Sequence, residues 1–339
     1  MLRVRFLNRN ESTMSFCGRF GAAIRCIAFL VFQSSATAAQ AVPLVDYHLH
    51  LFSPAIVELS STASSSARLP PIAANDLVAQ LDAAGIRRGL VLSVAYMYGN
   101  PNTPPVANEY ARVKAENDWT AEQVAQFPNR LRAFCSFNPL KDYALDELAR
   151  CAKDPQLHAG LKLHFGNSDV QLDNAQHVAQ LRRVFRAAND YHMPIVVHLH
   201  PSITKERPWG RDQARRFLNE VLSQTPDIPV QIAHLSSAGR YDDGSDQAMA
   251  VFAEAIAKRD PRAMRLYFDV SGIVGLEIPE TANLMALRIR QVGVARILYG
   301  TDGSADRLAS RKGWTALRQL PLSDEEFGVI ADNVVTYMR

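Results

Sequence analysis

The sequence lacks both a large excess of charge and a long apolar run. Its 37 lysines and arginines stand against 34 aspartates and glutamates, which leaves a formal net charge of +3 at pH 7. A balance this close to neutral predicts no nucleic-acid partner, because such partners attract strongly basic proteins. The apolar run at residues 26–32 is shorter than the roughly 20 residues that a membrane span needs. We therefore expect no stable membrane association after any leader is removed.

Cysteine is also scarce. The sequence has four cysteines, and two of them, Cys17 and Cys26, lie near the N-terminus. The other two, Cys135 and Cys151, do not form a CxxC or any other spacing typical of metal ligands. Cys135 lies in an apolar run, so a buried thiol is the expectation. A disulfide with Cys151 stays open if the chain reaches an oxidising compartment.

Residues 1–41 have the pattern of a secretory leader. Arginines precede the short apolar run, and small residues follow it, with cleavage signals at 36–38 (ATA) and 39–41 (AQA). The segment is therefore predicted to be a signal peptide with a disordered N-terminal part. The mature protein is predicted to be periplasmic or secreted. An uncleaved anchor or a disordered tail is the alternative, and Met14 is an alternative start.

Short apolar runs alternate with longer amphipathic runs from residue 43 onward. Strands are expected at 44–51, 89–96, 131–138, 160–165, 194–199, 229–235, 265–270 and 296–300. Apolar strands that alternate with helices predict a parallel sheet covered by helices. Eight such units predict one α/β domain over 42–339, a (β/α)8 TIM barrel. A doubly wound open sheet is the alternative, but no glycine-rich phosphate loop follows the first strand.

Polar side chains end several of these strands. The first strand ends with Asp46, His48 and His50, and alternation predicts that the three side chains share one face. Later apolar runs end at His198, at His234 and just before Asp302. A barrel brings these ends onto one rim, where imidazoles and a carboxylate can share a divalent metal. Two long irregular loops, 53–75 and 201–212, are expected at the same rim.

At this point the chain resembles the amidohydrolase superfamily. It is most similar to the amidohydrolase-related branch, which includes aminocarboxymuconate-semialdehyde decarboxylase-like enzymes. The resemblance extends from residue 45 almost to the C-terminus, and it rests on VDYHLH, the stretch 117–139, GLKLHF, PIVVHLH, AHLSS and LYGTDG. The order and spacing of these blocks are highly specific.

The resemblance implies a role for each rim residue. His48, His50, His198 and Asp302 match the metal ligands of the family, and His234 matches the histidine that orients or activates the attacking water. Such a metal lowers the pKa of water from 15.7 towards about 7. His234 and Asp302 would then be the catalytic pair that takes the proton.

The remaining polar residues near the rim are predicted substrate contacts or a further metal ligand. The predicted substrate contacts are Lys162, His164, His200, Arg207 and Arg211. Lys162 also matches the lysine that, once carboxylated, bridges two metals in binuclear relatives. One divalent metal, Zn²⁺, is the expectation, and a second metal at Lys162 stays open. Asp269 is expected to hydrogen-bond to residues of the site.

The sequence therefore predicts a metal-dependent hydrolase. Its substrate would be a small carbonyl compound, an amide, a lactone or a related ester. Non-oxidative decarboxylation or hydration of a small carboxylic acid at the same site is the alternative. A small molecule is the expected partner, and a homodimer is left open.

Overall fold

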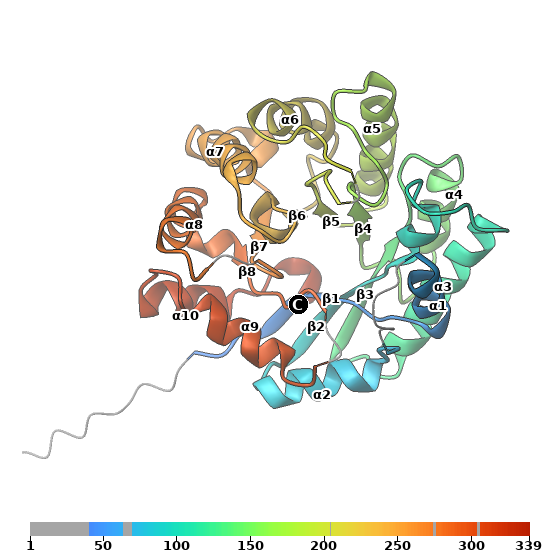
Figure 1. Cartoon of the computed structure of the whole chain (residues 1–339), viewed down its shortest axis with the longest axis horizontal. Coiled ribbons are helices and arrows are strands. Elements are labelled where there is room, and N and C mark those ends of the chain that lie inside the picture. The colour runs from blue at the N-terminus through green and yellow to red at the C-terminus, as the bar shows by residue number, and fades with distance from the viewer. Residues whose placement is uncertain (1–40, 64–69, 204, 274–275, 304–305) are drawn as a thin grey trace, which may run out of the picture. The chain divides into compact units, whose positions relative to one another are not determined.

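The structure is a computed structural model that describes residues 41–63, 70–203, 205–273, 276–303 and 306–339. Eight parallel strands pair in sequence order, and they form a ring surrounded by helices (Figure 1). They are β1 (Val45–Leu49), β2 (Arg88–Leu92), β3 (Leu131–Ser136), β4 (Leu161–His164), β5 (Ile195–His198), β6 (Val230–Ile232), β7 (Leu266–Asp269) and β8 (Ile297–Leu298). The prediction of a (β/α)8 barrel is confirmed.

The ring closes where the segment after β8 meets β1. The backbone N–H of Tyr47 donates to the carbonyl of Tyr299 at 2.8 Å, and that of Asp302 donates to the carbonyl of His48 at 2.8 Å. The two bonds continue the parallel ladder across the seam. They also place the residues that follow β8 directly beside the end of β1, where the predicted site begins.

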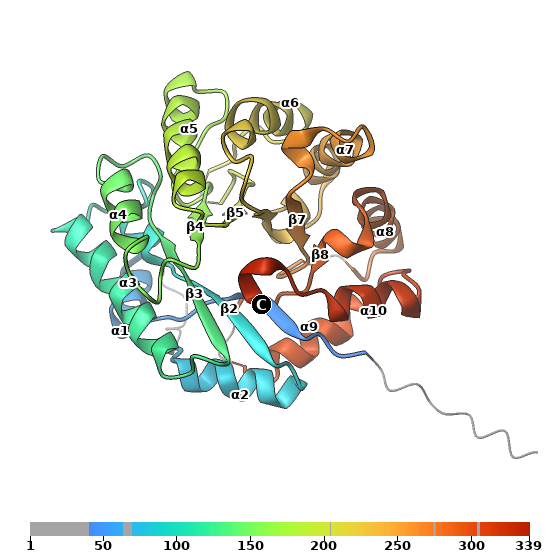
Figure 2. The same cartoon turned by 180° about the vertical axis from the view of Figure 1, so that it is seen from behind.

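The helices cover the outside of the ring (Figure 2). They are α1 (Pro54–Ala63), α2 (Ala74–Ala84), α3 (Glu109–Ala125), α4 (Ala144–Cys151), α5 (Ala175–Asp190), α6 (Arg211–Arg216), α7 (Asp243–Ala257), α8 (Pro279–Val292), α9 (Ala309–Leu317) and α10 (Asp324–Asp332). Local signals set their ends: α2 stops at Gly85, whose φ is 74°, and α10 begins with a capping box of Ser323 and Glu326. The expectation of an irregular loop over 53–75 is wrong in part, because α1 lies within it.

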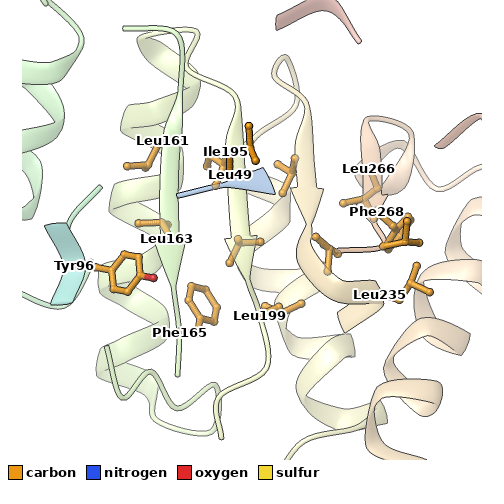
Figure 3. Packing of buried hydrophobic residues seen from close by; sticks show 14 of the residues in the cluster. Leu49, Tyr96, Leu161, Leu163, Phe165, Ile195, Leu199, Leu235, Leu266 and Phe268 are labelled. Carbon is orange, nitrogen blue, oxygen red and sulfur yellow. The ribbon is translucent and has the colours of Figure 1, made fainter. Parts of the chain in front are cut away.

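Apolar side chains pack on both sides of the strands. Leu161 and Leu163 of β4 and Ile195 of β5 point outward against the helices (Figure 3). A second cluster fills the barrel interior, where Tyr337 packs against Tyr47 with ring centroids 6.0 Å apart. Burial on both faces explains why the strands read as continuous apolar runs.

A disulfide joins the barrel to one of its helices. Cys135 of β3 and Cys151, the last residue of α4, form it with a Cα–Cα distance of 6.2 Å. The expectation of a free thiol at Cys135 is therefore wrong, because α4 packs on β3 and brings the two side chains together. The alternative that the sequence left open, the disulfide, is what the structure contains.

Residues 41–339 form one compact unit. No helix in the described part of this unit is long and apolar enough to cross a membrane. Residues 1–40 of the predicted leader lie outside the described residues.

Candidate metal centre and active site

β1 brings His48 and His50 to the C-terminal end of the barrel, but it does not bring Asp46 with them. The register between β1 and β2 shifts after Asp46, which breaks the alternation expected along this strand. The Asp46 carboxylate accepts hydrogen bonds from the Thr301 N–H and the Ser310 hydroxyl, each at 3.0 Å. The expectation that Asp46 shares a face with the two histidines is therefore wrong.

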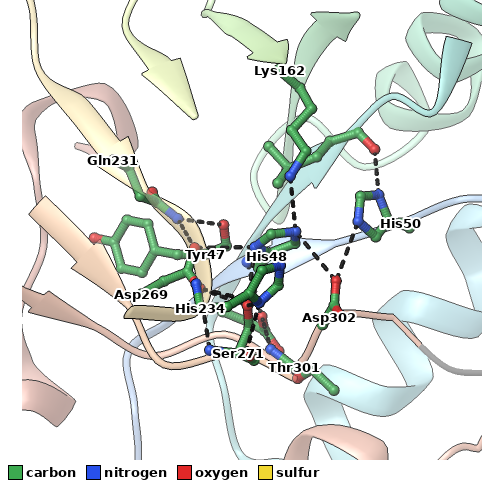
Figure 4. Close-up of polar contacts among 12 residues, drawn as sticks. Tyr47, His48, His50, Lys162, Gln231, His234, Asp269, Ser271, Thr301 and Asp302 are labelled. Carbon is green, nitrogen blue, oxygen red and sulfur yellow. Dashed lines mark hydrogen bonds and ion pairs between the residues drawn. The ribbon is translucent and has the colours of Figure 1, made fainter. Parts of the chain in front are cut away.

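Asp302 reaches the two histidines from the turn after β8. Its Oδ1 lies 3.3 Å from Nε2 of His48 and 3.5 Å from Nε2 of His50 (Figure 4). The backbone is left-handed here, with φ of 70° at Asp302 and 68° at Gly303. We expected the last strand to run to residue 300, but β8 ends at Leu298, and this turn directs the carboxylate back over β1.

The hydrogen-bond partners at Nδ1 of His48 and His50 decide whether Nε2 of each ring carries a proton or a lone pair. Nδ1 of His48 lies 3.0 Å from Oδ2 of Asp269, and Nδ1 of His50 lies 2.8 Å from the carbonyl of Leu92. Both acceptors require a proton on Nδ1, so Nε2 of each neutral ring carries a lone pair. Two lone pairs thus converge with the Asp302 carboxylate, and the three ligand atoms all lie within 4.8 Å of one another.

His198 lies at the end of β5, beside this cluster. Its ring centroid lies 4.9 Å from that of His234, and its buried Nε2 has no hydrogen-bond partner among the described residues. A buried polar atom without a partner is costly unless a ligand or ion satisfies it. Three imidazoles and one carboxylate are a donor set that suits a divalent cation. The residues present therefore fit a metal ion.

Asp269 ties the ends of three strands together. It is fully buried. Besides His48, it accepts hydrogen bonds from Gln231 Nε2 at 2.6 Å, from the N–H of His234 at 3.0 Å and from the Ser271 hydroxyl at 2.6 Å. These bonds engage both carboxylate oxygens, so Asp269 orients other residues instead of offering a free metal ligand.

His234 follows β6 in a turn of unusual backbone. The expected strand ends early, and His234, Leu235 and Ser236 have φ of 57°, 46° and 69°. Left-handed backbone costs non-glycine residues of order 1–3 kcal/mol each, and it persists mainly at functional sites. Nδ1 of His234 lies 2.7 Å from the carbonyl of Ser271. The same reasoning as for His48 leaves a lone pair on Nε2 of His234.

Lys162 of β4 places an ammonium group inside the barrel. Its Nζ lies 3.1 Å from Nε2 of His48, and the side chain is fully buried. Burial lowers the pKa of Lys162 to about 8, against the opposing influence of the Asp302 and Asp269 carboxylates. The group therefore lies beside the converging lone pairs and can donate to an oxygen there.

The charges around the cluster follow from burial and from close neighbours. Burial and the Lys162 charge lower the pKa of His48 to about 3. Burial also holds the pKa of His198 well below its usual range. Burial alone would raise the pKa of Asp302, but the surrounding histidines, His234 first among them, hold it well below its usual range. Neutral imidazoles and an ionised carboxylate are the forms that bind metals.

The two histidines that were predicted as substrate contacts, His164 and His200, also lie at the C-terminal end of the barrel. His164 ends β4 and stacks on His198, with ring centroids 4.0 Å apart and an interplanar angle of 14°. His200 lies two residues beyond β5, and its ring is 5.5 Å from that of Trp209. Both side chains are buried. β4 and β5 thus bring Lys162, His164, His198 and His200 to one side of the site.

The two predicted arginines lie elsewhere. Arg207 forms a two-pronged ion pair with Asp169, with Nε 2.9 Å from Oδ1 and Nη2 3.0 Å from Oδ2. Arg211 begins α6 with an exposed side chain. Within the described part of the chain, neither arginine contacts the cluster. Both were predicted as substrate contacts because they lie in or near the loop after β5. Position in a loop does not by itself show which way a side chain points.

Three residues that support the site, Gln231, Ser271 and Thr301, were not among those that the sequence predicted. Gln231 lies inside an apolar strand, Ser271 lies two residues after Asp269, and Thr301 precedes Asp302. Each is a polar side chain in or just beyond an apolar strand. That position could have identified them, because a buried polar group needs a hydrogen-bond partner.

Comparison with known proteins gives two results. The family model described as amidohydrolase matches residues 45–328. No curated protein sequence matches the chain.

Solved structures are similar to the chain over most of its length. One is 5-carboxyvanillate decarboxylase from Sphingomonas paucimobilis, 13% identical with a TM-score of 0.60, covering 86% of this chain and 97% of that one. Another is a dihydroxybenzoic acid decarboxylase from Polaromonas sp. JS666 with bound manganese and 2-nitroresorcinol, 16% identical with a TM-score of 0.55, covering 86% and 94%. A third is a probable 2-pyrone-4,6-dicarboxylic acid hydrolase from Acinetobacter baumannii with citric acid, 15% identical with a TM-score of 0.53, covering 86% and 97%.

Identities this low establish a shared fold and nothing more. The family match carries the stronger statement, because it spans most of the barrel and includes every strand described above. The chain therefore belongs to the amidohydrolase family, whose members are enzymes.

Proposed function

We propose that the protein is a metal-dependent hydrolase of a small carbonyl substrate, an amide, a lactone or a related ester. In this proposal His48, His50, His198 and Asp302 hold one divalent cation, and His234 acts with Asp302 on the proton. The observation that carries the proposal is that Nε2 of His48 and Nε2 of His50 converge on one oxygen of Asp302, while Nδ1 of each ring faces a hydrogen-bond acceptor.

A divalent cation bound there supplies Lewis-acid polarisation of a carbonyl and lowers the pKa of water from 15.7 to about 7. The remaining tasks fall to the chain itself. His234 holds its Nδ1 proton on the Ser271 carbonyl, so its Nε2 can accept a proton from the attacking water. Asp302, ionised and aimed at the same point, can hold that proton and return it to the leaving group.

Zn²⁺ is the cation that we propose, since three imidazoles and one carboxylate suit it. Manganese is the alternative, because a dihydroxybenzoic acid decarboxylase of similar fold was solved with it. One cation agrees with Lys162 as an unmodified ammonium group beside His48. A carboxylated Lys162 would instead bridge two cations, and metal stoichiometry separates these cases.

Decarboxylation is the second candidate function. Two of the similar structures are decarboxylases of aromatic acids, and each covers more than four-fifths of this chain. The buried Lys162 ammonium lies where it can pair with a carboxylate, which a carboxylic-acid substrate would provide. Decarboxylation would use the same cluster, with a proton delivered to carbon in place of an attack by water.

One experiment separates the two reactions. The mature protein is purified, its metal content is measured, and it is incubated with lactones, amides and aromatic carboxylic acids in ¹⁸O-labelled water. Hydrolysis predicts one equivalent of metal and ¹⁸O in the acid product without release of CO2. CO2 release without ¹⁸O in the organic product would replace the hydrolase proposal with the decarboxylase one.

We also propose that the mature protein is periplasmic or secreted. The leader pattern in residues 1–41 supports export. The disulfide between Cys135 and Cys151 also supports it, because disulfides form and persist in oxidising compartments. A small molecule is the proposed partner, and a homodimer is left to measurement. Fractionation of cells that express the full chain, with N-terminal sequencing of the product, tests both export and cleavage.

A further inference from the structure

We infer that His164 is a hydrogen-bond donor that holds an anionic oxygen of the substrate, and that it is not a metal ligand. The inference rests on the proposed function only in placing a substrate at the cluster. It comes from the geometry of the His164 ring, which differs from that of the three histidines whose lone pairs face the cluster.

The tautomer of His164 follows from a backbone group. The N–H of Asn167 donates to Nδ1 of His164 at 3.2 Å. A backbone amide can only donate here, so Nδ1 must be the accepting nitrogen. The proton of the neutral ring therefore lies on Nε2. A ring protonated on both nitrogens could not accept this hydrogen bond, so the same contact shows a neutral ring.

This arrangement is the reverse of that in the metal cluster. His48, His50 and His234 each place Nδ1 against an acceptor and leave a lone pair on Nε2. His164 accepts at Nδ1 and leaves a donor on Nε2. A protonated nitrogen cannot bind a cation. What lies behind each ring therefore separates the histidines that present a lone pair from His164, which presents a proton.

Packing leaves His164 a single direction in which to donate. One face of the ring stacks on His198, and Tyr96 lies 4.8 Å away, centroid to centroid. The Nδ1 edge is occupied by Asn167. The Nε2 edge has no hydrogen-bond partner in the described part of the chain, although 92% of the residue is buried. Lys162 lies two residues away on the same strand face, so an ammonium group and a neutral N–H donor are adjacent there.

His200 provides a matched control. Its Nδ1 also accepts a backbone N–H, that of Ser202 at 3.1 Å, so its proton also lies on Nε2. However, its Nε2 lies 3.9 Å from Oδ2 of Asp242. That carboxylate would repel a substrate anion, so the His200 donor serves the protein and not an anionic ligand.

Nitrogen-15 NMR of histidine-labelled protein tests the tautomers without any substrate. Zn²⁺-loaded protein is used, because this d¹⁰ ion has no unpaired electrons. Signals are assigned by single substitutions. We expect protonated Nε2 at His164 and His200, and protonated Nδ1 at His48, His50 and His234. A proton on Nδ1 of His164 would overturn the inference, whichever reaction the enzyme catalyses.

Binding of a probe tests the role of the donor. Isophthalate, a dianion, is compared with isophthalamide, its neutral analogue, by calorimetry on the Zn²⁺-loaded protein. His164→Gln keeps a donor near the Nε2 position, whereas His164→Asn keeps only the acceptor near Nδ1. We expect H164N to weaken isophthalate binding about 10-fold or more, as loss of a hydrogen bond to a charged group predicts. H164Q should stay within a few-fold of wild type, and His200→Asn should change little.

Three outcomes would overturn the inference: no isophthalate binding to wild type, equal binding by H164N and wild type, or equal losses in H164Q and H164N. Metal content and thermal unfolding of each variant are measured in parallel. Loss of metal from H164N alone would identify His164 as a ligand and would also contradict the inference. None of these results depends on whether the reaction is hydrolysis or decarboxylation, so failure here is distinguishable from failure of the proposed function.

Discussion

Oδ2 of Asp269 lies 3.0 Å from Nδ1 of His48. Burial alone would raise the pKa of Asp269, but the adjacent His48 holds it below its usual range. The carboxylate therefore stays ionised and keeps the proton of His48 on the side away from the cluster. Asp269 is neither a proposed metal ligand nor a proposed catalytic residue. It nevertheless decides which nitrogen of His48 faces the metal site.

Asp269→Asn is expected to weaken metal binding about 10- to 100-fold, the usual cost of losing a partner behind a metal-binding histidine. The amide cannot accept from Gln231, His234 and Ser271 as the carboxylate does. Competition with a chromophoric chelator measures the affinity. Asp246→Asn, which changes an ion pair with Arg288 and a hydrogen bond from Tyr241, is the control and should bind metal like wild type. Unchanged affinity in D269N would remove Asp269 from the positioning of His48.

Asp302→Asn should keep the fold and lose turnover by several orders of magnitude. The amide is a weak metal ligand and cannot accept the proton that the proposed reaction requires. Thermal unfolding and turnover of the substrate found in the panel are the measurements. Asp306→Asn, a change at an ion pair with Lys312 in the same loop, is the control. Near-normal turnover in D302N would exclude Asp302 from the mechanism.

Gly300→Ala should lower both the melting temperature and the metal affinity. A Cβ at this position would lie 2.7 Å from Cβ of His48 and 3.0 Å from Cβ of Ser271, so the seam between β8 and β1 must open. Gly328→Ala in α10 is the control, because its Cβ would meet nothing within 4 Å. Alanine there should stabilise the helix by about 0.5–1 kcal/mol. Equal melting temperatures for G300A and wild type would show that the seam tolerates the methyl group.

Glu116 gives the protein a pH dependence that is separate from the metal site. Burial raises the pKa of Glu116 to about 7, although the Ser53 hydroxyl donates to it at 2.6 Å. The folded state therefore retains a proton that the unfolded chain loses near pH 4.5. Stability is lost as the pH rises from about 4.5 through 7, by up to about 3 kcal/mol.

Glu116→Gln removes this titration and should be more stable than wild type at pH 8, with the difference shrinking towards pH 5. Urea unfolding at several pH values measures it. Glu122→Gln, an exposed position on the same helix, should show no such trend. A constant difference between E116Q and wild type across this range would mean that Glu116 does not retain its proton.

Reduction of the disulfide should cost about 3 kcal/mol, the loop-closure entropy expected for its 16-residue separation. Thermal unfolding with and without dithiothreitol, together with a thiol count, is the measurement. The melting temperature of the double variant C135A/C151A should be the same with and without reductant. If reduced wild-type protein, with both thiols free, has the same melting temperature as the oxidised protein, the disulfide does not stabilise the fold.

The barrel and the identity of the rim residues could be predicted from the sequence, because both depend on local patterns. Apolar runs that alternate with amphipathic ones specify parallel strands under helices. Histidines and an aspartate at the ends of such runs must meet once the strands form a ring, and the structure brings His48, His50, His234 and Asp302 together.

Only the tertiary structure decided how these groups are oriented and which neighbours they have. The register shift in β1 turns Asp46 towards Thr301, the Asp169 carboxylate holds Arg207, and packing of α4 on β3 joins Cys135 to Cys151. Each depends on contacts between segments far apart in the chain. The same holds for the histidines: the sequence shows an imidazole, but the group behind the ring determines whether it offers a lone pair or a proton.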